Sequence, residues 1–334
     1  MSLVLILLLA TSGCRFPGST PPVVKIGLTA PFEGLYRPLG YDALYGVKLA
    51  IRERNSAGGV GGAMVELVAL DDHFDPQRAV SVAREMAIDP DVMGVIGPLS
   101  GPLALAAQEE YQRAGLAFIT LAGDDALTGG GSDVTFRLAA RDADLGALAA
   151  RYALDELAAR RVAVVYSAPD AMSEAFCQTV REAGADLVWQ GTPSGQWLTA
   201  LQDAAPDVIL ITGDSVTGAE LARKIRETGL TATLIGGQSW ATPHLSSVGG
   251  EAVENALYVT SAPAPQDLEA EAFIADYQAL AGFPPGPYGA WAYDATQALL
   301  TALEQAIHAT GRPTRAGVTA QLRALSACQG LSGP

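Results

Sequence analysis

Beyond residue 22, short apolar runs alternate with segments whose apolar residues recur every three or four positions. The runs are typical of buried parallel strands and the periodic segments of amphipathic helices. In the first half, strands are expected at Val23–Leu28, Val65–Leu70, Gly94–Ile96 and Ala117–Ile119. Helices are expected between them at Tyr41–Ser56, Pro76–Ile88 and Pro102–Ala114. Asp75 is placed to cap the second of these helices, with Pro76 in its first turn. The alternation predicts an α/β fold with a parallel sheet.

The same alternation restarts after Arg137-Leu138-Ala139 and predicts a second α/β lobe. Its expected strands are Val162–Tyr166, Asp186–Trp189, Asp207–Thr212 and Thr233–Ile235, and its expected helices are Asp142–Ala158, Ser173–Ala183 and Thr217–Glu227. A proline-rich stretch, Pro263 to Pro265, then marks a second crossing. Helices at Leu268–Leu280, Ala290–Ala309 and Thr314–Leu325 are expected to return to the first lobe. The predicted division is therefore 23–138 with 263–327 in lobe 1, and 139–262 in lobe 2.

The first 22 residues have a different character. Leu3 to Ala10 form an apolar core that is too short to span a bilayer and has the length of a signal-peptide core. Thr11-Ser12-Gly13 and Cys14 follow, and they resemble a bacterial lipobox in which Cys14 is lipidated after cleavage. Residues 1–13 are thus expected to be a signal peptide and 14–22 a flexible tether. Thr11 stands where Leu is usual and no Lys or Arg precedes the core, so plain secretion and a misplaced start codon stay open.

Composition narrows the classes of partner. A length of 334 residues predicts about two domains. The formal charge of −15 argues against nucleic acid or an anionic membrane surface as partner, although simple solubility accounts for most of it. The three cysteines, Cys14, Cys177 and Cys328, show no metal-ligand spacing. Cys177 and Cys328 could pair in an oxidising compartment, but two free thiols are the favoured interpretation.

No motif for enzyme chemistry or a cofactor stands out. The glycines from Gly59 to Gly62 precede a strand instead of following one, which favours a hairpin-like turn over a dinucleotide loop. The segment 237–241 lacks the second glycine of a nucleophile elbow. The histidines, His73, His244 and His308, fall in unrelated segments, so no metal site is expected. Asp71-Asp72 could serve acid/base chemistry or bind a cation, but a structural turn is the favoured interpretation.

Four loops at the ends of predicted strands are better candidates for ligand binding, because such loops line the crevice of an open parallel sheet. They are Pro98–Pro102, Ala122–Asp125, Gly213–Ser215 and Gly236–Trp240. The first contains Ser100 and Gly101 at a helix start, where free backbone N–H groups suit a carboxylate or another acceptor. An ordinary N-cap by Ser100 is compatible with this role.

The order and spacing of residues from Lys25 to Pro76 resemble the start of type I periplasmic solute-binding proteins, above all the Leu/Ile/Val-binding family of ABC importers. Val95–Ser100, Ile119–Ala122 and Tyr288–Ala295 are further points of resemblance. The resemblance implies two parallel-sheet lobes joined by crossing hinge segments. It also implies capture of a small polar solute, such as an amino acid or amide, delivery to an ABC permease, and no enzymatic step. Family members usually continue beyond Pro334 with a third hinge segment, so that segment is expected to be missing.

The binding pattern of the family departs from this chain at several positions. The family serine that touches the ligand carboxylate falls on Gly101, and its threonine falls on Asp124 or Asp125. Two aromatic residues fall on Asp214 and Ala171, and the acid that binds the ligand ammonium falls on Gln238. Backbone contacts at Gly101 and Ala122 are expected to survive. The resulting contact set is Ser100, Gly101, Ala122, Asp124, Asp214 and Gln238, with Tyr36, Trp240 and Tyr288 as aromatic walls that could equally be core.

These departures predict that simple branched-chain amino acids are not the favoured ligands. Asp124 would repel a carboxylate and Gln238 would weaken ammonium pairing, although Asp214 could restore a negative partner. The alternative is that Asp124 and Asp125 point away from the ligand and cap a short turn. A ligand-sensing receptor domain of the same fold is the alternative function, and an enzyme is a distant third.

Overall fold

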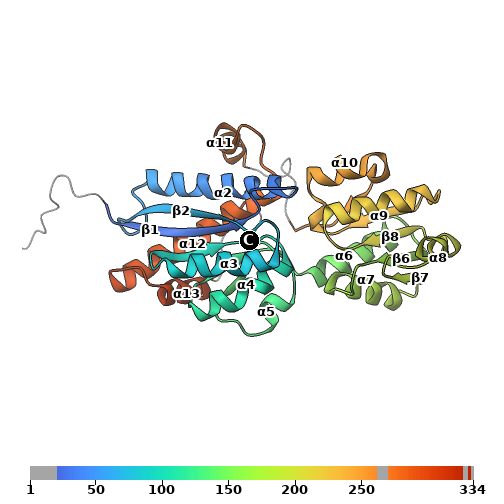
Figure 1. Ribbon diagram of the computed structural model, residues 1–334, viewed down its shortest axis with the longest axis horizontal. Helices are drawn as coiled ribbons and strands as arrows, with labels where there is room; N and C mark the ends of the chain where they lie inside the picture. Colours follow the sequence, from blue (N-terminus) through green and yellow to red (C-terminus); the bar gives the residue numbers. More distant parts are fainter. Residues whose placement is uncertain (1–20, 262–269, 326–329, 332–334) are drawn as a thin grey trace, which may run out of the picture.

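The computed structural model describes residues 21–261, 270–325 and 330–331. The expected signal peptide, Cys14, most of the tether, the proline-rich crossing and Cys328 lie outside these residues. The first and last parts of the described chain together form lobe 1, and residues 142–258 form lobe 2. The two lobes lie side by side along the longest axis (Figure 1).

Lobe 1 contains a five-stranded sheet in the order β2-β1-β3-β4-β5, with every pair parallel. Its strands are β1 (Val23–Ala30), β2 (Met64–Asp71), β3 (Val92–Ile96), β4 (Phe118–Thr120) and β5 (Thr135–Arg137). Residues of the central strands are almost fully buried, as expected for a sheet covered on both faces. In full register, Ala30 at the end of β1 pairs with Asp71 at the end of β2.

Helices cover both faces of this sheet. One face packs against α2 (Arg37–Ser56), α12 (Pro287–Thr310) and α13 (Arg315–Ala324). The other face packs against α3 (Pro76–Ile88) and α4 (Gly101–Arg113). The short α5 (Ala126–Gly129) lies beside α4, and α11 (Glu271–Ala281) packs on the outside of α2. The C-terminal helices therefore complete the core that the N-terminal strands begin.

Lobe 2 repeats the plan with the sheet order β10-β9-β8-β6-β7, again parallel throughout. Its strands are β6 (Arg161–Val165), β7 (Asp186–Gly191), β8 (Val208–Ile211), β9 (Thr233–Gly236) and β10 (Leu257–Tyr258). One face carries α6 (Asp142–Asp155) and α7 (Ala171–Glu182). The other carries α8 (Trp197–Ala204), α9 (Ser215–Glu227) and α10 (Pro243–Gly249).

The two-sheet α/β architecture and nearly all the expected elements are confirmed. The Asp75 carboxylate accepts a hydrogen bond from Arg78 N (2.7 Å) and Pro76 begins α3, as predicted. Val60 and Ala63 form an antiparallel bridge around a glycine turn, which confirms the hairpin-like turn. The sequence pattern missed β5, α5, α8, α10 and β10, together with two 3-10 turns at Gln238–Trp240 and Gly250–Val253.

The lobes are joined by little beyond the segments that cross between them. Among the described elements, every extensively packed pair lies within one lobe. At the crossings, Ala140 N donates to Ser261 Oγ (3.1 Å), so the outgoing and returning segments lie next to each other. Within the described part of the chain, no helix combines the length and apolar character needed to cross a membrane. Outside the crossings, contact between the lobes among the described residues is therefore limited to a few side chains.

Candidate ligand-binding cleft

The site residues predicted for lobe 1 gather around the start of α4. Ser100 takes the N-cap position, but its side chain makes no capping hydrogen bond. A Cβ atom on Gly101 would lie 2.8 Å from Asp124 Cβ and 2.9 Å from Asp124 Oδ2. A residue larger than glycine would therefore collide with Asp124. Gly101 and Asp124, two of the departures from the family pattern, therefore depend on each other. The Asp124 side chain occupies the space that a side chain at position 101 would need.

The Asp124 carboxylate has two different environments. Its Oδ1 accepts from Ala126 N (2.9 Å), so the turn-capping alternative is correct for this oxygen. Its Oδ2 lies beside the first turn of α4. Asp125 Oδ2 accepts from Ala143 N (3.1 Å) and so caps α6 in the other lobe. Asp125 thus stabilises the crossing, whereas Asp124 keeps one oxygen beside the helix start.

The backbone N–H of Ala122, one of the predicted ligand contacts, has a partner within lobe 1. Ala122 is buried and its N–H already donates to Thr120 Oγ1 (3.1 Å). Thr120 Oγ1 in turn donates to Pro98 O (2.8 Å), which ties the two loops together. The Ala122 N–H is used within lobe 1 and is not free for a ligand.

Lobe 2 contributes the loops after β8 and β9. Asp214 is the N-cap of α9 and accepts from Val216 N (2.9 Å), Thr217 N (3.1 Å) and Thr217 Oγ1 (2.7 Å). Ser239 Oγ donates to Gly213 O (2.6 Å), so the two loops are joined. Between them, Gln238 presents a buried Oε1 atom with no hydrogen-bond partner. A buried amide oxygen without a donor is rare in folded proteins.

Tyr36 connects the two sides. It lies just before α2 in lobe 1, and its hydroxyl donates to Asp214 Oδ1 of lobe 2 (2.7 Å). Its ring stacks on Phe74 (3.9 Å between centroids) and meets His244 edge-on (6.1 Å). Burial, followed by the bond to Asp214, raises the pKa of Tyr36. Burial opposes ionisation of Asp214, but the donors from Tyr36, Thr217 and Val216 hold its pKa below the usual value.

Acidic groups dominate the crossing next to Asp124. Burial, then the charges of Asp124, Asp170 and Asp125, raise the pKa of Asp142 to about 7. Arg137 opposes this shift, and its Nη1 donates to the carbonyls of Gly123 (3.2 Å) and Asp124 (3.3 Å). Asp124, Asp125, Asp142 and Asp170 thus form an acidic group at the crossing, which Arg137 balances in part.

Two of the expected aromatic walls are part of the cores. Trp240 is 1 % exposed and packs across Gly218 and Gly236 inside lobe 2. Tyr288 is 6 % exposed and packs edge-on against Trp291 (5.7 Å) in lobe 1. Of the three aromatic candidates, Tyr36 is the one that the structure brings into contact with both lobes.

The comparisons with known proteins agree with this architecture. A family model described as periplasmic binding protein matches residues 23–334. The chain belongs to this family. It is 28% identical over 301 residues to a Leu/Ile/Val-binding protein homolog of Brucella abortus, covering 87% of this chain and 81% of the relative. It is 26% identical over 295 residues to an amino acid binding protein of Pseudomonas aeruginosa, covering 85% and 79%.

Solved structures give the same result. A leucine-binding protein of Thermotoga maritima superposes with a TM-score of 0.82 at 27% identity, covering 93% of this chain and 90% of that one. A branched-chain amino-acid substrate-binding protein of Streptococcus pneumoniae, solved with isoleucine, has a TM-score of 0.82 at 23% identity and the same coverage, which supports the fold. The family of binding proteins and its fold, expected from the sequence, are thus confirmed.

Sequence reasoning missed several residues that adjoin the candidate site. Phe74 and His244 flank Tyr36, and Asp142 and Asp170 complete the acidic group. Phe74 follows directly on β2, so the rule that ligands bind at strand ends could have found it. His244 lies in α10, a helix that the sequence pattern does not predict. The raised pKa of Asp142 results from burial, so neither residue can be recognised from the sequence.

Proposed function

We propose that this protein is the solute-binding component of an ABC importer of the branched-chain amino-acid and amide class. Its solute would bind between the lobes, against the α4 start and the loops after β8 and β9. The observation that carries the proposal is Tyr36, which spans from lobe 1 to Asp214 at the expected contact loop of lobe 2 (2.7 Å). The membership in a family of binding proteins supports capture without chemistry on the solute, and the importer's permease would be the partner.

The charge of the cleft supports a narrower ligand class. Relatives are described as Leu/Ile/Val-binding, and a free amino acid brings a carboxylate. Here Asp124 Oδ2 lies beside the start of α4, and two like charges 4 Å apart repel by about 4 kcal/mol at an effective dielectric constant of 20. A solute with a neutral or cationic polar group at this end avoids the repulsion. Its donor can also satisfy the unpartnered Gln238 Oε1.

Calorimetric titration with matched ligands tests both parts of the proposal. Leucinamide replaces the carboxylate of leucine by a neutral amide, so we expect it to bind at least tenfold more tightly than leucine, isoleucine or valine. Asp124→Asn keeps an oxygen for Ala126 N and removes the charge, so it should improve leucine binding. Asp133→Asn makes the same charge change at an exposed site beside Arg323 and serves as the control. Micromolar or tighter binding of leucine by the unaltered protein would contradict the ligand class, while binding of no small polar solute would contradict the function.

We also propose a cell-surface or periplasmic location with a lipid anchor on Cys14, a residue outside the described part of the chain. The support is the lipobox-like Thr11-Ser12-Gly13-Cys14 sequence. Cys14→Ser should release the protein from the membrane fraction, because the acyl chains supply the membrane affinity. A variant that stays in that fraction would argue against the anchor.

A further inference from the structure

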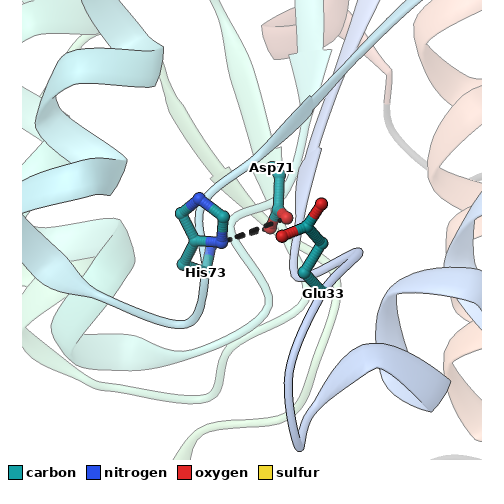
Figure 2. A group of neighbouring side chains, drawn as sticks. All are labelled: Glu33, Asp71 and His73. Carbon is teal, nitrogen blue, oxygen red and sulfur yellow. Dashed lines mark hydrogen bonds and ion pairs between the residues drawn. The ribbon is translucent and has the colours of Figure 1, made fainter.

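Three potential metal ligands meet at the ends of two adjacent strands in lobe 1 (Figure 2). Glu33 follows β1, Asp71 is the last residue of β2, and His73 comes two residues later. One donor atom from each side chain lies within 4.8 Å of the others. The strand register, with Ala30 opposite Asp71, brings the Glu33 loop to this place. Spacing along the sequence could not reveal the set, because Glu33 is about forty residues away from its partners.

Asp71 is fixed in position while one of its oxygens lacks a donor. Its Oδ1 accepts from Phe32 N (2.9 Å) and His73 N (2.8 Å), which confirms the predicted turn role and orients the carboxylate. Its Oδ2 is buried and has no hydrogen bond. The Nδ1 atom of His73 lies 3.2 Å from Oδ2. A carboxylate oxygen held out of solvent without a donor is destabilising unless a positive group completes its surroundings.

The geometry suits a bound ion. Two ligands that each lie 2.0–2.2 Å from one metal ion are about 3–3.5 Å apart, and the Nδ1–Oδ2 distance of 3.2 Å falls in that range. His73 is half exposed and Glu33 is exposed, so an ion has access and water can fill the remaining positions. Two carboxylates balance the charge of a divalent cation.

The ligand types select the class of metal. One imidazole nitrogen with two carboxylate oxygens is a set that suits zinc and neighbouring divalent transition metals. Calcium and magnesium prefer oxygen ligands alone and gain little from an imidazole. We propose that Glu33, Asp71 and His73 form a binding site for a divalent transition metal ion of the zinc type.

Such a site would connect the two loops that position Tyr36. Glu33 belongs to the loop that leads to Tyr36, and His73 directly precedes Phe74, on which the Tyr36 ring stacks. A metal ion would join these loops a few residues away from the contact between Tyr36 and Asp214. The ion would therefore stabilise the two loops of lobe 1 that hold Tyr36, whether or not a solute is bound between the lobes.

The test is a calorimetric titration of zinc chloride into the full chain after removal of metal with a chelator. We expect one equivalent to bind. Glu33→Gln and His73→Asn should each weaken binding at least tenfold. Asn is chosen for position 73 because that residue has φ +52°, a conformation that Asn tolerates. His308→Asn removes an exposed histidine elsewhere and should leave binding unchanged.

Two results would overturn the site. One is the absence of stoichiometric zinc binding. The other is zinc binding that is the same in His73→Asn and the unaltered protein, which would place the ion elsewhere, for instance at a cysteine. Calcium and magnesium, titrated in the same way, should bind at least a hundredfold more weakly than zinc. In the second case, equal affinity for calcium would identify the site as one with oxygen ligands alone. A thermal melt of each variant establishes that it is folded, and no solute is needed.

Discussion

Asp142 is the residue whose environment gives the clearest pH signature. Its pKa is raised from 3.8 to about 7, first by burial and then by Asp124, Asp170 and Asp125. The folded protein thus keeps a proton that the unfolded chain releases, so the contribution of Asp142 to the free energy of unfolding falls as pH rises from about 4 to 7. Asp142→Asn should stabilise the protein at pH 8, on the order of 2 kcal/mol, since the side chain keeps some contact with solvent.

Denaturant unfolding at pH 4.5 and pH 8 measures this effect. The advantage of the Asn variant should shrink as pH falls through 7 toward 4. Asp144→Asn is the matched control, because Asp144 lies in the same first turn of α6 but is exposed and paired with Arg141. A variant that is equally destabilised at both pH values would show that Asp142 acts as an ordinary helix-start residue.

The sequence predicts where some of the candidate site residues lie, but not how their side chains pack. The positions of Asp124, Asp214 and Gln238 at strand ends follow from the alternation of strands and helices. Packing between segments far apart in the chain decides which oxygen of Asp124 faces the start of α4. It also decides whether Trp240 is a core residue or a ligand contact. Such packing leaves no trace in local periodicity.

At the scale of elements, the close contact between α2 and α12 depends on a pair of glycines. A Cβ atom on Gly46 would lie 2.1 Å from Gly289 O, so the helix backbones approach as closely as glycine allows. Gly46→Ala improves helix propensity, by up to about 1 kcal/mol, but forces the helices apart. We expect a net loss of about 1–3 kcal/mol in the free energy of unfolding.

Gly129→Ala serves as the control for this change, because no atom lies within 4 Å of its added Cβ in α5. It should be neutral or slightly stabilising in the same thermal or denaturant measurement. A Gly46→Ala variant as stable as the unaltered protein would mean that the two helices can separate without loss of packing.

The elements that sequence reasoning found and missed differ in how they are stabilised. The α2 helix has an apolar stripe that includes Leu44, Val47 and Ile51, from which the sequence predicts it. The predicted start at Tyr41 lies four residues after the observed start at Arg37. The short α10 begins at Pro243 in a segment of small and polar residues. The two-residue β10 exists because it pairs with β9 at the edge of the sheet. Short elements of this kind form through tertiary contacts that no local pattern records.

For the whole molecule, the contact between Tyr36 and Asp214 predicts how the lobes respond to a small change. The bond has a charged acceptor and joins lobes that share no extensive packing among the described elements. Tyr36→Phe removes the hydroxyl and should increase the radius of gyration of the ligand-free protein in small-angle X-ray scattering. Tyr41→Phe removes the hydroxyl of a tyrosine of α2 that is 38% exposed, and it should leave the radius unchanged.

Scattering with a saturating solute tests closure. A solute that contacts both lobes stabilises the closed arrangement, so the radius of gyration should decrease and the unfolding temperature should rise. Leucinamide is the first probe for this measurement. A bound solute that leaves the radius unchanged would indicate a rigid cleft and contradict the hinge mechanism.

The neighbouring crossings, joined by the hydrogen bond from Ala140 N to Ser261 Oγ, also bear on how the chain folds. The halves of lobe 1 are separated in sequence by the whole of lobe 2, yet they must meet where Arg54 pairs with Glu304 (2.9 Å). Ala140 and Ser261 are 121 positions apart, and closing a loop of this length opposes folding by about 4 kcal/mol of chain entropy. A lobe 2 that has already folded holds its two ends together and removes most of that barrier. The inserted lobe thus acts as an internal cross-link that assembles the lobe into which it is inserted.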